Sequence, residues 1–183
     1  YKTALIFLLF TLCFLLGAFI SNFLTTLASK KNSKNPHFYP IVLEIILILF
    51  VGFSVYEADN SVLNTQLYTF SLLIAMGIQN ALVTYVSKSV VRTTHLTGLF
   101  TDLGIDLSQL LFNKTVETRL TLLNNILLKF SIILFFSFGC ILGGYLFHYL
   151  NLKTLLVASL FLIIALYFDF LRYRYFLLKR KMK

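Results

Sequence analysis

The sequence predicts an all-α membrane protein, a polytopic helical bundle with five membrane spans and one further amphipathic or re-entrant helix. Hydrophobic residues make up 58% of the chain, and its mean hydropathy is +0.85. Charged residues make up only 13%, whereas a soluble domain carries about 25%. Five apolar stretches also reach the length of roughly 17–25 residues that a spanning helix needs. Together these observations favour an integral membrane domain over residues 1–183.

The predicted spans are apolar stretches separated by polar or charged connections. Because lipid offers no hydrogen-bond partners to the backbone, each span should be an α-helix. Pro40 opens the second span, at a helix position where its missing N–H costs nothing. Glu44 follows it and is expected to interact with the helix dipole. The spans cover residues 4–28, 40–56, 67–86, 130–150 and 154–173.

Residues 95–112 predict a different kind of helix. Seven large apolar residues recur at helical spacing and share one face, while Asp102, Asp106 and Gln109 fall on another. Such a helix lies on a membrane surface, or it is a re-entrant or buried helix that lines a cavity. The apolar face comprises Leu96, Leu99, Phe100, Leu103, Leu107, Leu110 and Leu111.

Basic residues predict the orientation of the chain. If residues 95–112 do not cross the membrane, 14 of the 16 basic residues fall on one side, and Lys2 and Lys153 remain on the other. By the positive-inside rule that side is cytoplasmic. The basic tail, residues 174–183, is therefore expected in the cytoplasm, next to anionic lipid headgroups. A nucleic-acid partner is not expected.

An internal repeat appears when the chain is shifted by 122 residues. The stretch FLLGAFISNFL at 14–24 then falls on FSFGCILGGYL at 136–146. Each copy holds small residues four apart, which let helices approach closely. The two copies run in opposite directions through the predicted topology, as in many secondary transporters. The residues expected to serve helix packing are Gly17, Ser21, Gly139, Gly143 and Gly144.

The repeat predicts inverted three-span halves in a six-span protein. Residues 1–56 would be the remainder of the first repeat, and residues 67–173 would be the second. A further span and a second polar helix are then expected upstream of residue 1.

The densest polar stretch carries two motif-like elements. The first is G-x-Q-N-A, and the second is T-T-x-x-T-G-x-x-T-D-x-G. With these elements the chain resembles the YoaK-type bacterial transmembrane family, a domain of unknown function (1275), over essentially all its residues. The resemblance implies a multi-pass protein of the bacterial inner (plasma) membrane and supplies no reaction. The motif residues are Gly77, Gln79, Asn80 and Ala81, then Thr93, Thr94, Thr97, Gly98, Thr101, Asp102 and Gly104.

Polar residues in a membrane chain are costly and often functional. Asp102 and Asp106 lie one helical turn apart, where paired acids share a proton or bind a cation, or where they are simply solvated. Gln79 and Asn80 either line a substrate path or form interhelical hydrogen bonds. His95 is structural or part of a proton relay. The predicted substrate-path residues are Gln79, Asn80, His95, Thr97, Gly98, Thr101, Asp102 and Asp106.

The function predicted from these features is transport of a small solute or an ion, with a polar site around residues 95–112. The alternative is a non-transporting membrane protein that serves in assembly or regulation. An enzyme is not expected, because the chain lacks metal-ligand spacing, a phosphate-binding loop and a nucleophile motif. No cofactor and no metal are expected, and the expected partners are the lipid bilayer and a small solute or ion.

Overall fold

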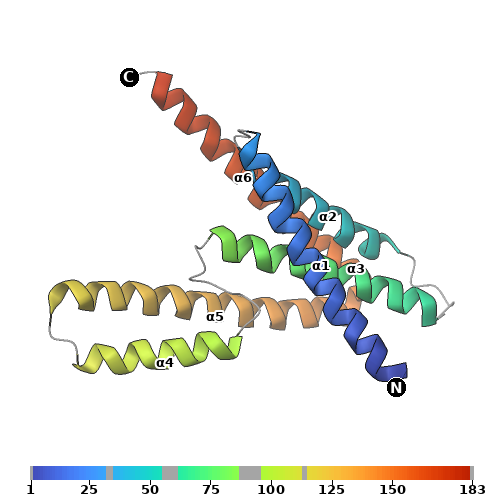
Figure 1. Cartoon of the computed structure of the whole chain (residues 1–183), viewed down its shortest axis with the longest axis horizontal. Coiled ribbons are helices and arrows are strands. Elements are labelled where there is room, and N and C mark those ends of the chain that lie inside the picture. Colours follow the sequence, from blue (N-terminus) through green and yellow to red (C-terminus); the bar gives the residue numbers. More distant parts are fainter. Residues whose placement is uncertain (1, 32–34, 55–61, 87–95, 113–114, 182–183) are drawn as a thin grey trace. The chain divides into compact units, whose positions relative to one another are not determined.

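The computed structural model describes residues 2–31, 35–54, 62–86, 96–112 and 115–181 (Figure 1). Over these ranges the chain forms helices and no strand, which confirms the predicted all-helical fold. Each predicted span and the predicted helix over 95–112 correspond to a helix. The helices are α1 (Lys2–Lys30), α2 (Phe38–Phe53), α3 (Val62–Val86), α4 (Leu96–Phe112), α5 (Val116–Leu150) and α6 (Thr154–Lys181).

Two helices are longer than the sequence indicated. Helix α5 begins at Val116, well before the predicted start at residue 130, and α6 continues through most of the basic tail to Lys181. Between them lies one turn of 3-10 helix, Asn151–Lys153. Asn151 has a φ of 48°, a left-handed conformation that asparagine tolerates better than most residues, so the chain can reverse there.

Among the described residues, three helical stretches are long and apolar enough to span a membrane: Ala4–Lys30, Leu63–Tyr85 and Thr118–Arg172. The last contains both α5 and α6, with the turn Asn151–Lys153 between them. Helix α2 is apolar but shorter, with 16 residues. The chain is therefore built for a membrane, and the number of five spans stays a prediction.

The chain divides into two compact units. Unit 1 comprises residues 1–82 and 150–183, and unit 2 comprises residues 83–149. This boundary does not follow the predicted repeats, which divide the chain between residues 56 and 67. Each unit is described by itself.

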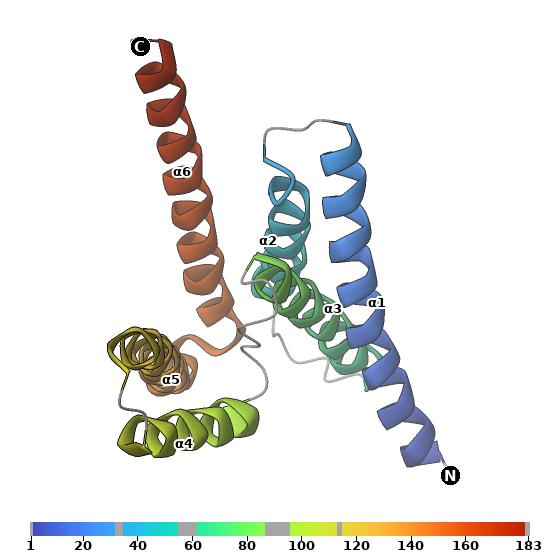
Figure 2. The ribbon, with the colours of Figure 1, turned by 60° about the vertical axis from the view of Figure 1, so that its left-hand side comes forward.

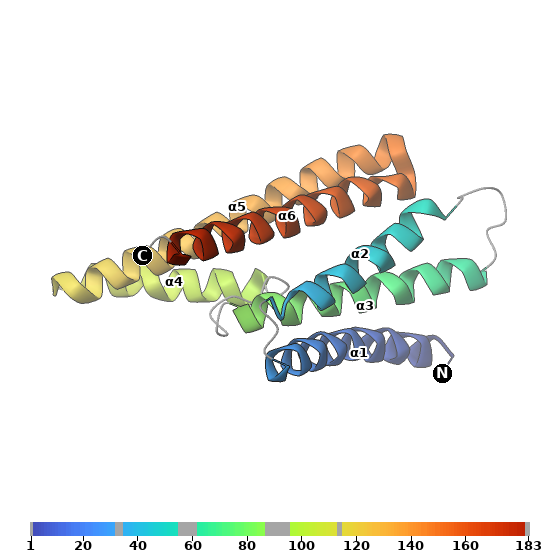
Figure 3. The same cartoon turned by 90° about the horizontal axis from the view of Figure 1, so that it is seen from above.

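In unit 1, helix α2 packs between α1 and α6 and runs opposite to both (Figures 2 and 3). Near the end of α2, Gly52 lies against Leu155 and Leu156 at the start of α6, and a Cβ on this glycine would sit 2.9 Å from the Leu156 side chain. Ile45 and Ile48 are buried along α2. The small residue Gly52 thus sets how closely the two helices approach.

Helices α1 and α3 cross at two glycines in unit 1. A Cβ on Gly17 would overlap the backbone carbonyl of Ile74, and a Cβ on Gly77 would overlap that of Phe14. Both glycines are buried. Because any larger residue would meet backbone rather than a movable side chain, this crossing requires glycine on both helices.

In unit 2, helix α4 lies antiparallel to the first half of α5 (Figure 1). Leu99 of α4 and Leu122 and Ile133 of α5 are buried. Helix α5 has 35 residues, or about 52 Å at 1.5 Å per residue, which exceeds the hydrocarbon thickness of about 30 Å. The length of α5 therefore accommodates a spanning segment and the additional stretch along which α4 packs.

Candidate functional site

Unit 1 buries several polar side chains among apolar ones and exposes many large apolar side chains. Large apolar side chains such as Leu15, Phe19 and Phe53 are exposed, which suits a surface in contact with lipid. The buried polar side chains of this unit come from all four of its helices. They are Ser21 and Thr25 of α1, Glu44 of α2, Ser71 of α3 and Ser159 of α6.

Most of these hydroxyl groups bind their own helix. Thr25 donates to the Ser21 carbonyl at 2.8 Å, and Ser71 donates to the Leu67 carbonyl at 2.9 Å. Ser159 donates to the carbonyl three residues earlier, also at 2.8 Å. Such bonds satisfy a hydroxyl donor locally, so these groups can face the interior of a bundle without a partner on another helix.

Two buried polar groups of this interior are exceptions, the Ser21 hydroxyl, whose Oγ has no hydrogen-bond partner among the described residues, and the Glu44 carboxyl group. The Glu44 side chain is 2% exposed, and its Oε2 atom has no hydrogen-bond partner among the described residues. The sequence led us to expect an acid that interacts with the helix dipole. That expectation is wrong, because α2 begins at Phe38 and the carboxyl group lies in its second turn, inside the unit.

The sequence did contain a signal for this burial. Glu44 is the only charged residue of α2. The residues three and four positions away on either side are Pro40, Ile41, Leu47 and Ile48, so α2 has no polar face on which the carboxyl group could reach water. An acid surrounded in this way at helical spacing has to be buried.

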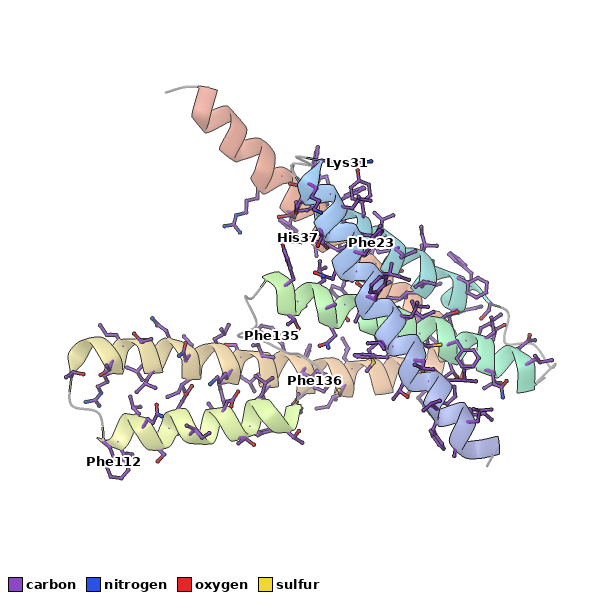
Figure 4. All side chains as sticks on the ribbon, in the orientation of Figure 1. Phe23, Lys31, His37, Phe112, Phe135 and Phe136 are labelled. Atoms are coloured by element: carbon purple, nitrogen blue, oxygen red, sulfur yellow. The ribbon has the colours of Figure 1, made fainter. Side chains whose placement is uncertain are left out.

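His37 precedes α2 and lies near the described part of α6 (Figure 4). Burial lowers the pKa of this imidazole from 6.5, and the Asp169 carboxylate opposes the shift. The electrostatic effect of Asp169 places the start of α2 close to the later part of α6, as expected for two antiparallel helices. His37 is therefore mainly neutral at neutral pH.

We expect Asp169→Asn to lower the pKa of His37 further, because the substitution removes the charge that favours the imidazolium. The NMR titration of the His37 ring signals, assigned with His37→Asn, measures this change. Since the pKa is lower in the folded than in the unfolded protein, His37 supports folding fully above pH 6.5, and this support declines as the pH falls toward the folded pKa. An upward shift in Asp169→Asn would contradict the arrangement.

In unit 2, Asp106 of α4 accepts a hydrogen bond from the Lys129 ammonium of α5 at 2.7 Å. Both side chains are largely buried, 13% and 12% exposed. Asp106 shares the buried side of α4 with Leu99, whereas Asp102 is exposed. One of the two predicted acids thus holds α4 to α5, and the other faces outward.

The remaining residues of the predicted substrate path are mostly exposed. Thr97, Gly98 and Thr101 of α4 are exposed, and Thr101 donates to the Thr97 carbonyl at 2.9 Å. Gln79 of α3 is exposed and Asn80 is half-buried with an interaction partner. His95 lies outside the described residues. The α3 residues belong to unit 1 and the α4 residues to unit 2, and their joint role in a substrate path stays a prediction.

The expected packing residues of the second repeat have open surroundings. A Cβ on Gly139, Gly143 or Gly144 would meet no atom within 4 Å. Their equivalents Gly17 and Ser21 in α1 are buried. Within the described ranges no group of three or more His, Cys, Asp or Glu side chains could hold a metal ion.

One protein family matches residues 1–168 of the chain, and its description is "Protein of unknown function (DUF1275)". The chain belongs to this family. The match confirms the resemblance drawn from the two polar elements, and as a DUF1275 protein the chain inherits no described activity. No curated protein and no solved structure matches it.

Proposed function

We propose that this DUF1275 protein transports a small solute or an ion across the bacterial inner membrane, with its C-terminus in the cytoplasm. The observation that supports this proposal is the buried Glu44 carboxyl group, whose Oε2 has no partner among the described residues, inside a unit that exposes many large apolar side chains. A protein that only anchors or packs helices gains nothing from such a group, since polar atoms buried without partners are destabilising. Ionisable residues inside membrane bundles usually serve a transported ion or solute.

We propose unit 1, in place of the region around α4, as the location of the transport site. In α4 the buried acid is already paired with a lysine, and the other polar side chains are exposed. In unit 1 buried polar side chains come from four helices. The second candidate function is a role in assembly or regulation. The pairing of Asp106 with Lys129 favours it, because this buried charge pair serves helix packing, but the observation concerns unit 2 only.

A transport assay with defined pools of solutes tests the proposal. Full-length protein is reconstituted into liposomes and offered radiolabelled amino acids, sugars, nucleosides, carboxylic acids and monovalent cations. We expect at least one pool to enter faster than it enters liposomes without protein. Matched liposomes that contain heat-denatured protein control for leakage. Entry of no pool above these controls would overturn the transporter proposal and favour the assembly or regulatory role.

A further inference from the structure

Glu44 lacks the partners that normally accompany a buried carboxylate. Its Oε2 receives no hydrogen bond from any described residue, and the ion pair that these residues contain lies in unit 2. The other titratable side chains of α2 and of the elements around it are not partners of this atom. They are Cys13 and Lys30 on α1, Lys31 directly after α1, His37 directly before α2, Tyr39 on α2, Tyr68 and Tyr85 on α3, Lys153 in the 3-10 turn, and Tyr167, Asp169 and Arg172 on α6.

Burial without a partner restricts the protonation state. Moving a carboxylate away from water without a compensating cation is strongly unfavourable, and such a group takes up a proton instead. The conformation described by the structure is therefore compatible with a neutral Glu44. To become ionised, this group needs water or a cation at Oε2, and no described residue supplies a cation there.

The register of α2 against α6 places Glu44 close to the centre of the predicted inverted repeat. Gly52 lies against Leu156, and Asp169 acts on His37, so residue 44 lies level with about residue 163 of the antiparallel partner. If α2 and α6 are inverted repeats displaced by 122 residues, a two-fold axis relates them, and on α2 this axis passes near residues 42 and 43. If the two helices are aligned instead by their first residues, Phe38 and Thr154, the axis passes near residues 45 and 46 of α2. Both estimates lie within two residues of Glu44.

A position near the centre of an inverted repeat is where secondary transporters bind substrates and coupling ions, because alternating access opens the two sides of the membrane around it. Ser21 on α1 offers a second buried polar atom, Oγ, which has no hydrogen-bond partner in the part of the chain that the structure describes. Two buried groups on two helices that pack together thus retain unused hydrogen-bonding capacity. This capacity can serve a group that enters only in another conformation.

We propose that Glu44 is a proton-binding site and that the coupling ion of this protein is the proton, an inference that rests on the proposed transport function. In the packed conformation Glu44 carries the proton. When water reaches the site, the O–H bond of the carboxyl group breaks, its electron pair stays on the oxygen, and water leaves as hydronium. The resulting carboxylate is stable only while the site is open, so proton release and opening are coupled.

Infrared spectroscopy of the reconstituted full-length protein tests this inference without any solute. The C=O stretch of a protonated carboxyl group is followed as the pH is raised. We expect a band that persists in wild type at neutral pH and is absent in Glu44→Gln, which keeps the size of the side chain and mimics its neutral form. The matched control Asp169→Asn changes an exposed acid of the same unit and should keep the band.

Three infrared results would contradict the proposal. An equal band in Glu44→Gln, or no such band in wild type, would overturn the assignment of the proton to Glu44. Loss of the wild-type band when sodium chloride replaces choline chloride at constant pH would mean that sodium competes for the site, which would overturn the choice of the proton. Circular dichroism checks that each variant is folded. If the band behaves as expected but no solute is transported, the proposed function fails and the proton site remains.

Discussion

Gly17→Ala should lower the free energy of unfolding by about 2 kcal/mol, because the new Cβ would overlap the Ile74 carbonyl and force α1 and α3 apart. Overpacking in a tight core typically costs roughly 1–3 kcal/mol. Here the obstacle is backbone, which cannot turn aside as a side chain can. Equilibrium unfolding of the purified protein by sodium dodecyl sulfate in mixed micelles, followed by circular dichroism, measures the difference. Gly77→Ala should behave alike, since it meets the Phe14 carbonyl at the same crossing.

The matched control is Gly104→Ala in α4. A Cβ on Gly104 would meet nothing within 4 Å, and alanine in a helix interior is favoured over glycine by roughly 0.5–1 kcal/mol. The same chemical change should therefore stabilise at one position and destabilise at the other. If Gly17→Ala were as stable as Gly104→Ala, the close crossing of α1 and α3 would not exist in the protein.

The helices were predictable because their signal is local. Apolar stretches of spanning length and the periodicity of residues 96–112 are properties of neighbouring residues, and both were confirmed as helices. The extension of α5 to Val116 was less apparent, since the sequence of residues 116–129 contains polar residues, among them Lys129, which pairs with Asp106 of α4. A local hydropathy pattern indicates which part of a helix can be surrounded by lipid. It does not indicate which part is covered by a second helix.

The candidate site was harder to predict because it depends on contacts between helices. Because residues 77–106 contain many polar side chains, the sequence predicted a site on α3 and α4. In the structure one of the acids of α4, Asp106, pairs with a lysine of α5. The pairing joins residues 23 positions apart and has no signature in a single sequence. Glu44 did have a local signal, its apolar neighbours at helical spacing in α2, and its full burial in the structure distinguishes it from an acid at a helix start.

Asp106→Asn should destabilise unit 2 by about 2 kcal/mol. The variant leaves the Lys129 ammonium without its carboxylate in a site where both side chains are at most 13% exposed. Loss of one partner costs about 3–5 kcal/mol for fully buried pairs, and exposed pairs contribute less than about 1 kcal/mol, so a value between these limits is expected. Hydrogen exchange of the α4 amides should accelerate most, because α4 is the helix that this pair holds against α5.

A second variant separates the charge pair from general packing. Asp106→Leu combined with Lys129→Leu removes both charges together and extends the apolar contact that begins at Leu99. Replacement of a buried ion pair by apolar residues is often neutral or stabilising, so the double variant should recover most of the stability that Asp106→Asn loses. Asp102→Asn, at an exposed acid one turn away on the same helix, should change little. Equal losses in Asp102→Asn and Asp106→Asn would show that α4 depends on its overall charge and not on this pair, and the polar residues of α4 would again be candidates for a site.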